Sequence, residues 1–467
     1  MNIGVVNVLT NFMVEGWAIE PDQVTPAPVA IEVDGKQTAV VQPSVFRQDL
    51  VDAHIGDGQA GFRFYFPQIA SRDKSAVVVV RRVSTGDQLS GPTVVERLAP
   101  MYSKPISRIM AQAYSASTIA AAVSTPGVLD VTAAVVIPTN SELSIKPLSA
   151  SVKRISDVSI GGNALTLAFK EAGLSDNICV PCGVTFKAHF DPTTTERFFA
   201  FELVEQNSYL AATTGLGLGP AARFAASPNL DWMTFAKEEN SSRTCGPGAL
   251  SGNLANTGLS TAYQLLSIAT EYRNGTIDTI LDWGVGYGRV AIPFKRVVAP
   301  HARVLGIDVD KFNVDWCREH LRDIEISQCA FFPPTEIASD SVDLVYAISV
   351  MNHLTEQNQI KWLIELRRIL KPGGIAILSA VTEHALTTHK YLDPVTLRDL
   401  YTRGIADAQL DYNLGPHLAI KDYYRATYQL NKHIASVWGE FFEIVEVYPG
   451  AVTGLQDAVV MRRNGDT

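Results

Sequence analysis

The sequence predicts a multidomain protein in which an all-β N-terminal region precedes an α/β domain with a doubly wound sheet. Three observations support this prediction. The chain has 467 residues, more than one hydrophobic core usually serves. Short strand-like segments recur through residues 1–98, separated by turn residues. Further on, an apolar run leads into a turn with glycines at 284, 286 and 288, and a helix-like segment follows, which is how a βαβ unit begins.

Residues 1–98 are predicted to form a sandwich-like β-domain, because turn pairs such as Asp34-Gly35 separate short strands at regular spacing. The expected strands are Ile3–Val8, Val14–Ile19, Val29–Val33, Phe62–Phe66 and Ala76–Val83. The region resembles a small bacterial β-domain that is attached to glycosyltransferases and other polysaccharide enzymes. The resemblance rests on Val14–Ala18, Val33–Gly35, Phe46–Asp49 and Gly61–Phe64. Two roles stay open for Trp17, stacking on a sugar ring or a place in the core.

Residues 99–206 are predicted to form a second β-rich domain, and residues 207–255 a linker or lid. Small residues over Ile106–Val123 favour a helix at the start of the second domain. Cys179 and Cys182 are interpreted as structural, because a zinc site needs a second ligand pair. The linker is rich in glycine, serine and asparagine, which do not build a core. The strands expected in the second domain are Val131–Ile137, Leu165–Phe169, Val184–Phe190 and Phe198–Val204.

Residues 256–467 alternate strand-like and helix-like segments, the pattern of a parallel sheet covered by helices. Helices are expected over Leu259–Thr270 and Glu356–Leu370, the second ending at the stop signal Lys371-Pro-Gly-Gly374. The second strand ends in Asp308, 26 residues after Asp282, and an acid there can accept hydrogen bonds from a ribose diol. The expected strands are Thr279–Asp282, Val304–Asp308, Ile324–Ala330, Asp343–Ser349, Ile375–Ala380, Phe442–Tyr448 and Ala458–Met461.

Four motifs follow one another between residues 282 and 374. They are Asp-x-Gly-x-Gly-x-Gly from Asp282, Gly-Ile-Asp ending at Asp308, Ser341–Ala347, and Leu-Lys-Pro-Gly-Gly ending at Gly374. In this order they resemble class I S-adenosylmethionine-dependent methyltransferases, over roughly residues 256–467. A bacterial subgroup that reads Asp-Trp-Gly-Cys-Gly-x-Gly-Arg is most similar, with Val285 in place of the cysteine. The resemblance implies a Rossmann-like methyltransferase domain whose seven-stranded sheet is closed by an antiparallel hairpin.

The resemblance also implies S-adenosyl-L-methionine as the cofactor. The glycine loop should receive its methionine part, Asp308 should hold the ribose, and the ends of strands two to four should enclose the adenine. Thr257, just before the predicted helix, either touches the methionine end or caps the helix. The expected cofactor-binding residues are Asp282, Gly284, Val285, Gly286, Gly288, Asp308, Val309, Phe331, Phe332 and Ser349. No metal site is expected.

Two histidines are candidate catalytic residues, because attack by a neutral hydroxyl or amine needs removal of a proton. His353 lies just beyond the fourth strand and His384 just beyond the fifth, where open α/β sheets bind their ligands. Histidine can act as a base near neutral pH. His353 is the first candidate, and the alternative is a loop histidine that shapes the cofactor pocket. The tyrosine-rich segment Tyr391–Ser436 suits either recognition of a sugar or small molecule, or a cover over the sheet.

Composition excludes several classes of function. The net charge of −9 and the absence of a basic run argue against a nucleic-acid partner, as does the lack of an Asn/Asp-Pro-Pro-Tyr tetrapeptide that clamps a flipped base. No apolar stretch reaches the roughly 18–20 residues of a membrane span. The N-terminus does not resemble a secretory signal, and five scattered cysteines suit a reducing compartment. We therefore expect a cytoplasmic protein.

The predicted function is O-methylation of a sugar hydroxyl in surface-polysaccharide or glycan-precursor biosynthesis. The substrate rests only on the resemblance of the N-terminal domain. Two alternatives stay open: methylation of a small metabolite or natural product, and a glycan-binding or scaffold protein with an inactive methyltransferase domain. The expected partners are a small-molecule or glycan acceptor, a second copy of the chain, or polysaccharide-assembly proteins bound through the β-domains.

Overall fold

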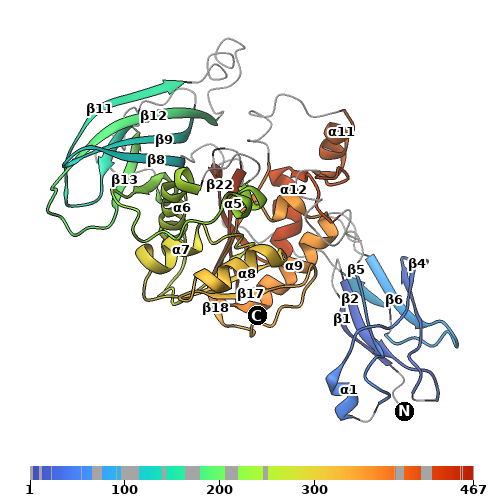
Figure 1. Cartoon of the computed structure of the whole chain (residues 1–467). Helices are drawn as coiled ribbons and strands as arrows, with labels where there is room; N and C mark the ends of the chain where they lie inside the picture. Colours follow the sequence, from blue (N-terminus) through green and yellow to red (C-terminus); the bar gives the residue numbers. More distant parts are fainter. Residues whose placement is uncertain are drawn as a thin grey trace. The chain divides into compact units, whose positions relative to one another are not determined.

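The chain forms two compact units, Met1–Ala99 and Pro100–Thr467, drawn in Figure 1. The structure, a computed structural model, describes residues 4–9, 13–22, 24–53, 55–65, 76–90, 92–95, 115–138, 143–162, 179–205, 219–245, 251–382, 384, 394–411, 423–452, 454 and 456–465. Within these ranges no helix is both long enough and apolar enough to cross a membrane.

The first unit contains two antiparallel sheets. One has the order β1 (Gly4–Leu9), β2 (Met13–Ala18), β5 (Gly61–Tyr65); the other has the order β4 (Lys36–Val41), β3 (Val29–Val33), β6 (Ala76–Arg82), β7 (Thr93–Val95). A short helix, α1 (Gln48–Asp52), follows β4. Both sheets contribute to one core, for example Phe62 from the first and Val78 from the second. Trp17 belongs to a second buried cluster with Ile19, Leu50 and Ala60, so it is a core residue.

A second pair of antiparallel sheets opens the larger unit. The four-stranded sheet has the order β11 (Val152–Gly162), β12 (Cys179–Phe190), β9 (Val128–Pro138), β8 (Ser115–Thr125), and the three-stranded sheet has the order β10 (Leu143–Pro147), β13 (Phe199–Glu205), β14 (Arg223–Ala226). Phenylalanines from both sheets meet in the shared core. The ring of Phe186 lies edge-on to Phe201 at 5.1 Å and to Phe224 at 6.2 Å.

The expected helix over Ile106–Val123 is wrong where the structure describes it, because Ser115–Thr125 is strand β8. The run of serine and alanine there has helix propensity, but nine of the eleven strand residues pair instead with β9, and tertiary pairing overrides a weak local preference. The expected strand over Leu165–Phe169 lies outside the described residues. Inside the expected linker, β14 pairs with β13, and α5 (Glu238–Cys245) is a helix.

The centre of the larger unit is a seven-stranded sheet. Its order is β17 (Glu325–Gln328), β16 (Arg303–Asp308), β15 (Thr279–Trp283), β18 (Val342–Ala347), β19 (Leu370–Ala380), β23 (Gln456–Arg462), β22 (Glu443–Val452). The first five strands are parallel, and β23 is antiparallel to β19 and to β22. Every residue of β18 is buried, as expected for a central strand covered on both faces. The predicted sheet and its closing hairpin are thereby confirmed.

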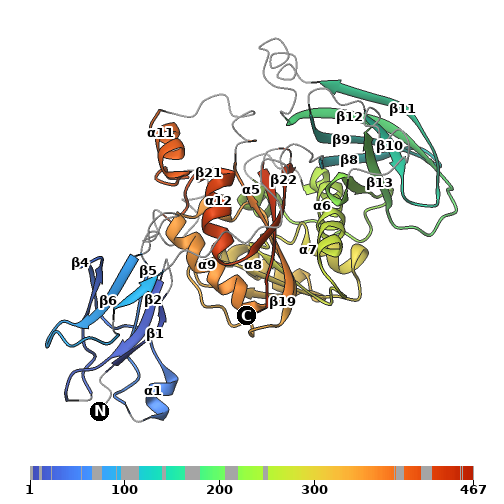
Figure 2. The ribbon, with the colours of Figure 1, turned by 180° about the vertical axis from the view of Figure 1, so that it is seen from behind.

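Helices cover both faces of this sheet. Figures 1 and 2 place α6 (Ser251–Tyr272) and α7 (Ala291–Pro293) on one side, and α9 (Glu356–Ile369) and α12 (Asn431–Val437) on the other. A π-helical turn, Phe294–Val298, continues α7. Helix α8 (Lys311–His320) packs on β16 and β17. The segment between β19 and β22 adds α11 (Pro394–Arg403) and the short pair β20 (Ile405–Ala406) and β21 (Tyr428–Gln429).

Helix α6 joins the central sheet to the second pair of antiparallel sheets, strands β8 to β14, which we call the β-region. Its Thr257 hydroxyl donates to the carbonyl oxygen of Ile119 on β8 at 3.1 Å. Asn256 accepts from the backbone of Ser227 at 2.8 Å, and the Gln264 amide donates to the carbonyl oxygen of Ala221. Thr257 is therefore used in this structure to fasten β8 to the helix.

Candidate active site

The turn after β15 is the local feature on which the site is built. Gly284, Gly286 and Gly288 have φ values of 82°, 52° and 83°, in the left-handed region that favours glycine. The backbone nitrogens of Gly284 and Val285 both donate to the carbonyl oxygen of Ile307, at 2.8 and 3.1 Å. These bonds fold the turn back against β16. The turn therefore leaves bare backbone at the carboxyl end of the sheet, where such folds bind ligands.

The carboxylate of Asp308 fastens this turn to the end of β16. Its Oδ2 accepts from the backbone nitrogen of Gly286 at 2.8 Å, and its Oδ1 accepts from that of Asp310 at 2.8 Å. Burial raises the pKa of Asp308, and the backbone donors act in the opposite direction. A carboxylate oxygen has a second lone pair, so both oxygens can also accept from ligand hydroxyls.

Helix α5 is held over the turn by polar bonds to the start of α8. Arg243 donates to both carboxylate oxygens of Asp310, through Nε at 2.8 Å and Nη2 at 2.7 Å. This pairing raises the pKa of Arg243. Asp310 is also the N-cap of α8, and Asn240 of α5 donates to Asn313 at 2.9 Å. Thr244 of the same helix lies so close that a Cβ on Gly286 would meet its Cγ2 at 2.5 Å.

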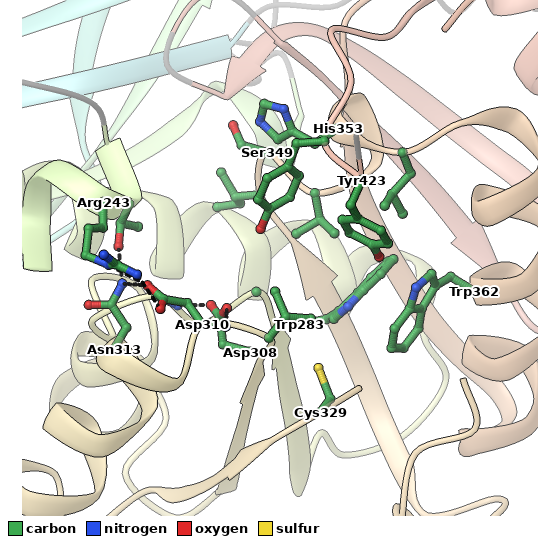
Figure 3. Close-up of a pocket in the computed structure, with 18 residues that line it drawn as sticks. Arg243, Trp283, Asp308, Asp310, Asn313, Cys329, Ser349, His353, Trp362 and Tyr423 are labelled. Atoms are coloured by element: carbon green, nitrogen blue, oxygen red, sulfur yellow. Dashed lines mark hydrogen bonds and ion pairs between the residues drawn. The ribbon is translucent and has the colours of Figure 1, made fainter. Parts of the chain in front are cut away.

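Aromatic side chains stand opposite this polar network, as Figure 3 shows. The rings of Trp283 and Trp362 lie 4.6 Å apart and are tilted by 32°. The hydroxyl of Tyr423 donates to the carbonyl oxygen of Phe331 at 2.6 Å, and its ring lies edge-on to that of Phe331 at 4.8 Å. This wall is apolar, with hydroxyl groups at its edge.

The stretch that follows β18 supplies Ser349 and His353, which lie above Asp308 in Figure 3. Ser349 has φ = 58°, unusual for a residue with a side chain. Its backbone nitrogen donates to the Ser379 hydroxyl at 2.7 Å, and its own hydroxyl accepts from the Gln456 amide at 2.6 Å. His353 ends the 3-10 turn Met351–His353. Its ring lies edge-on to Tyr424 at 5.5 Å.

Together these groups enclose one pocket of the larger unit. Six predicted site residues line it: Gly284, Gly286, Asp308, Val309, Ser349 and His353. The lining also includes residues that were not predicted as site residues, from β15, α5, α8, α9 and the stretches that follow β16, β17, β18 and β19: Arg243, Thr244, Trp283, Asp310, Asn313, Cys329, Ile348, Val350, Leu354, Trp362, Tyr423 and Tyr424. Trp283 lies within the Asp-Trp-Gly motif, and Tyr423 and Tyr424 belong to the tyrosine-rich segment, of which Tyr391, Tyr412 and His417 lie outside the described residues.

Five other predicted cofactor residues do not line this pocket. Asp282 is buried behind the turn, where the Tyr346 hydroxyl donates to its Oδ2 at 2.7 Å. Val285 is buried against Gly306, and Gly288 faces Leu321 of the helix layer. Phe331 and Phe332 both lie edge-on to the Tyr423 ring, and Phe332 is 41% exposed. Their predicted roles stay predictions.

His384, the second candidate base, is buried beneath the β22–β23 hairpin and is not among the lining residues. Its Nε2 lies 3.0 Å from the carbonyl oxygen of Gly454. Burial raises the pKa of the neighbouring Asp457 carboxyl, which the charge of His384 lowers in turn. The structure thus brings only His353 of the two histidines to the pocket.

Comparisons with known proteins agree with this geometry. The family model described as a methyltransferase domain matches residues 280–374, which include the glycine turn, Asp308, Ser349 and His353. An uncharacterized methyltransferase of Schizosaccharomyces pombe is 32% identical over 107 residues, 21% of this chain and 37% of the yeast protein. The chain thus spans little more than a third of the length of this curated relative.

Solved structures with similarity to the chain include several methyltransferases. An S-adenosylmethionine-dependent methyltransferase of Methanosarcina mazei has 18% identity and a TM-score of 0.33, over 43% of this chain and 98% of its own. Human N-acetylserotonin methyltransferase, solved in complex with S-adenosylmethionine, has 13% identity and a TM-score of 0.29, over 46% of this chain and 56% of its own. On the family match, residues 280–374 form the core of a methyltransferase domain.

Proposed function

We propose that the chain transfers a methyl group from S-adenosylmethionine to a hydroxyl group of a sugar, in surface-polysaccharide or glycan-precursor biosynthesis. When bound, this cofactor supplies a methyl group on a positively charged sulfur. The protein's task is then to hold the acceptor oxygen in line with that methyl group and to accept its proton. A cytoplasmic location belongs to the same proposal.

The residues of the pocket fit the cofactor. The cradle at Gly284 and Gly286 has no side chain, and a Cβ on Gly284 would come within 2.5 Å of Val350. Asp308 points its carboxylate at this cradle and can accept from ribose hydroxyls. Trp362 and Tyr423 offer a flat apolar wall at the other side, which suits an adenine ring. The observation that carries the proposal is the bond between Gly286 and Asp308, which joins the two expected cofactor contacts inside one pocket.

Two observations support a sugar as the acceptor. Tyr424 reaches the pocket from the segment after β19, and a ring with a polar edge suits sugar recognition. The N-terminal unit is built from β-strands, like the polysaccharide-enzyme domain that its sequence resembles. A small metabolite with a free hydroxyl would use the same groups. A screen of methyl glycosides, nucleotide sugars and phenolic acceptors for formation of S-adenosylhomocysteine distinguishes the two substrate classes.

Calorimetric titration with S-adenosylmethionine and with S-adenosylhomocysteine tests the cofactor site. The Asp308→Asn variant keeps the shape of the side chain but removes its charge, and we expect binding to weaken at least about 10-fold, because charged hydrogen bonds contribute roughly 1.5–3 kcal/mol each. Asp315→Asn is the matched control, because Asp315 is exposed on α8 and pairs with Lys311. Absence of binding by the folded wild type would favour the scaffold alternative.

A further inference from the structure

His353 has acceptor atoms at one ring nitrogen and a donor at the other. The carbonyl oxygen of Arg425 lies 3.2 Å from Nδ1, and Oδ2 of Asp411 lies 3.3 Å from the same atom. Two acceptors can share one ring nitrogen only if that nitrogen carries the hydrogen. At Nε2 the neighbour is the amide nitrogen of Asn352, at 3.2 Å, which can only donate. All three contacts therefore agree on an Nδ1–H tautomer with the lone pair on Nε2.

The acceptor atoms come from the segment between β19 and β22. The backbone nitrogen of Arg425 donates to the carbonyl oxygen of His353 at 2.9 Å, and that of Thr427 donates to Asn352 at 2.8 Å. The backbone nitrogen of Asp411 donates to the carbonyl oxygen of Tyr424 at 3.0 Å. This bond joins the stretch 394–411 to the stretch that begins at Tyr423. The segment is thus bonded to the turn that carries His353, and it brings Asp411 to the imidazole from 58 residues along the chain.

The pair is mostly shielded from water. The side chains of His353 and Asp411 are 13% and 15% exposed, so the interaction between them is screened less than at the surface. His353 lines the pocket with Ser349 and Tyr424, whereas Asp411 is not among the lining residues. Asp411 thus contacts Nδ1 from outside the pocket lining, and Nε2, the other ring nitrogen, contacts the Asn352 amide.

We propose that Asp411 is the positioning residue of His353, and that Nε2 of His353 is the base that receives the proton of the acceptor hydroxyl. This inference rests on the proposed methyl transfer. The acceptor hydroxyl replaces the Asn352 amide as the donor to Nε2. As the proton passes to Nε2, the electron pair of the O–H bond stays on oxygen and forms the bond to the methyl carbon, whose former pair stays with sulfur. The carboxylate of Asp411 stabilises the imidazolium that results.

The tautomer can be measured without any acceptor. In protein labelled with ¹⁵N-histidine, long-range proton–nitrogen correlation spectra distinguish a protonated Nδ1 from a protonated Nε2, and His353→Asn assigns the signal. We expect His353 in the Nδ1–H form in the wild type. In Asp411→Asn the amide can donate to Nδ1, so we expect a larger Nε2–H fraction. An Nε2–H histidine in the wild type would overturn the proposal.

Kinetics test the same residue once an acceptor is found. With methyl glycosides as probes, Asp411→Asn should lower kcat about 10- to 100-fold with little change in KM or in cofactor affinity, and Asp411→Glu should recover part of kcat. Asp407→Asn is the control, because Asp407 fastens the same segment by accepting from the backbone of Glu356 at 2.9 Å. Equal losses in the Asp407 and Asp411 variants would reduce Asp411 to a structural tether. Failure of the wild type to bind the cofactor would instead refute the proposed function. The tautomer of His353 would not be affected by that result, because it is measured without cofactor or acceptor.

Discussion

Asp282 makes the stability of the methyltransferase domain depend on pH. The side chain is buried at the end of β15 and receives one hydrogen bond, from the Tyr346 hydroxyl at 2.7 Å. Burial, the largest cause, raises the pKa of this carboxyl from 3.8 to about 7. The Tyr346 bond and the charge of Arg289 lower it, and the negative charge of Asp308 raises it. Near neutral pH the fold therefore holds a carboxyl that resists ionisation.

The sign of the effect follows from comparing the folded and unfolded chains. Between pH 3.8 and about 7 the folded state keeps the Asp282 proton while the unfolded state loses it, so stability falls as the pH rises through this window. The shift in pKa corresponds to about 4 kcal/mol, all of it lost above the folded pKa. Asp282→Asn has no charge to bury and can still accept from Tyr346. We therefore expect the variant to be about 4 kcal/mol more stable than the wild type at pH 8.5 and equally stable at pH 4.

Hydrogen exchange of the β15 peptide, followed against urea, measures this difference locally, which matters because two compact units need not unfold together. Wild type and variant are compared at each pH, so the intrinsic exchange rate cancels. A difference between them that stays constant from pH 4 to pH 8.5 would refute the reasoning. So would a variant that is less stable than the wild type at pH 8.5.

Two further predictions concern the glycine turn and the helix above it. Gly286→Ala should weaken cofactor binding at least about 10-fold by calorimetry, because alanine in the left-handed region costs roughly 1–2 kcal/mol and the new Cβ would meet Thr244 at 2.5 Å. Gly373→Ala is the control, because Gly373 has a similar φ of 74° but no atom within 4 Å of a new Cβ. Equal cofactor affinity in the two variants would contradict the prediction. Arg243→Met should speed amide exchange in residues 238–245 and weaken cofactor binding about 10-fold. The substitution removes the charged hydrogen bonds between Arg243 and Asp310, and such a bond contributes roughly 1.5–3 kcal/mol. Arg303→Met is the control, because it removes an ion pair that is more than half exposed, and it should change neither the amide exchange of α5 nor the affinity for the cofactor. Amide exchange as slow in the Arg243 variant as in the wild type would count against the role of α5 as a cover.

The central sheet could be predicted because its strands are covered on both faces. A strand such as Val342–Ala347 must be apolar throughout, and such runs stand out in a sequence. Strands with a solvated face carry a weaker signal. Lys36–Val41 has no fully buried residue and begins with three polar side chains, so the sequence did not mark it as a strand. Val152–Gly162 was missed for the same reason, because most of its residues face solvent.

The predicted part of the site is the part that local sequence determines. Gly286 and Asp308 are placed by a turn and by the end of a strand, both of which follow from neighbouring residues. Arg243 precedes β15, the first strand of the central sheet in the sequence, by more than 30 residues. Asp411 and Tyr423 follow β19, the fifth strand of that sheet, by at least 30 residues. Their positions depend on long-range bonds, such as that between Arg243 and Asp310, 67 residues apart. No local periodicity encodes such a pairing, so these residues become visible only in the folded molecule.

The contacts that α6 makes with the β-region limit where the chain can be divided. One helix carries Asn256, Thr257 and Gln264, which bond to the β-region, and also packs on the central sheet. A chain cut at residue 250 would expose those amides and the hydroxyl to water, together with the apolar side chains around them. The β-region leaves the ribosome first and is complete before the helix that docks on it. Neither half is therefore a portable module, and engineered chimaeras should place their junctions before residue 115, not at the border that the methyltransferase motifs suggest.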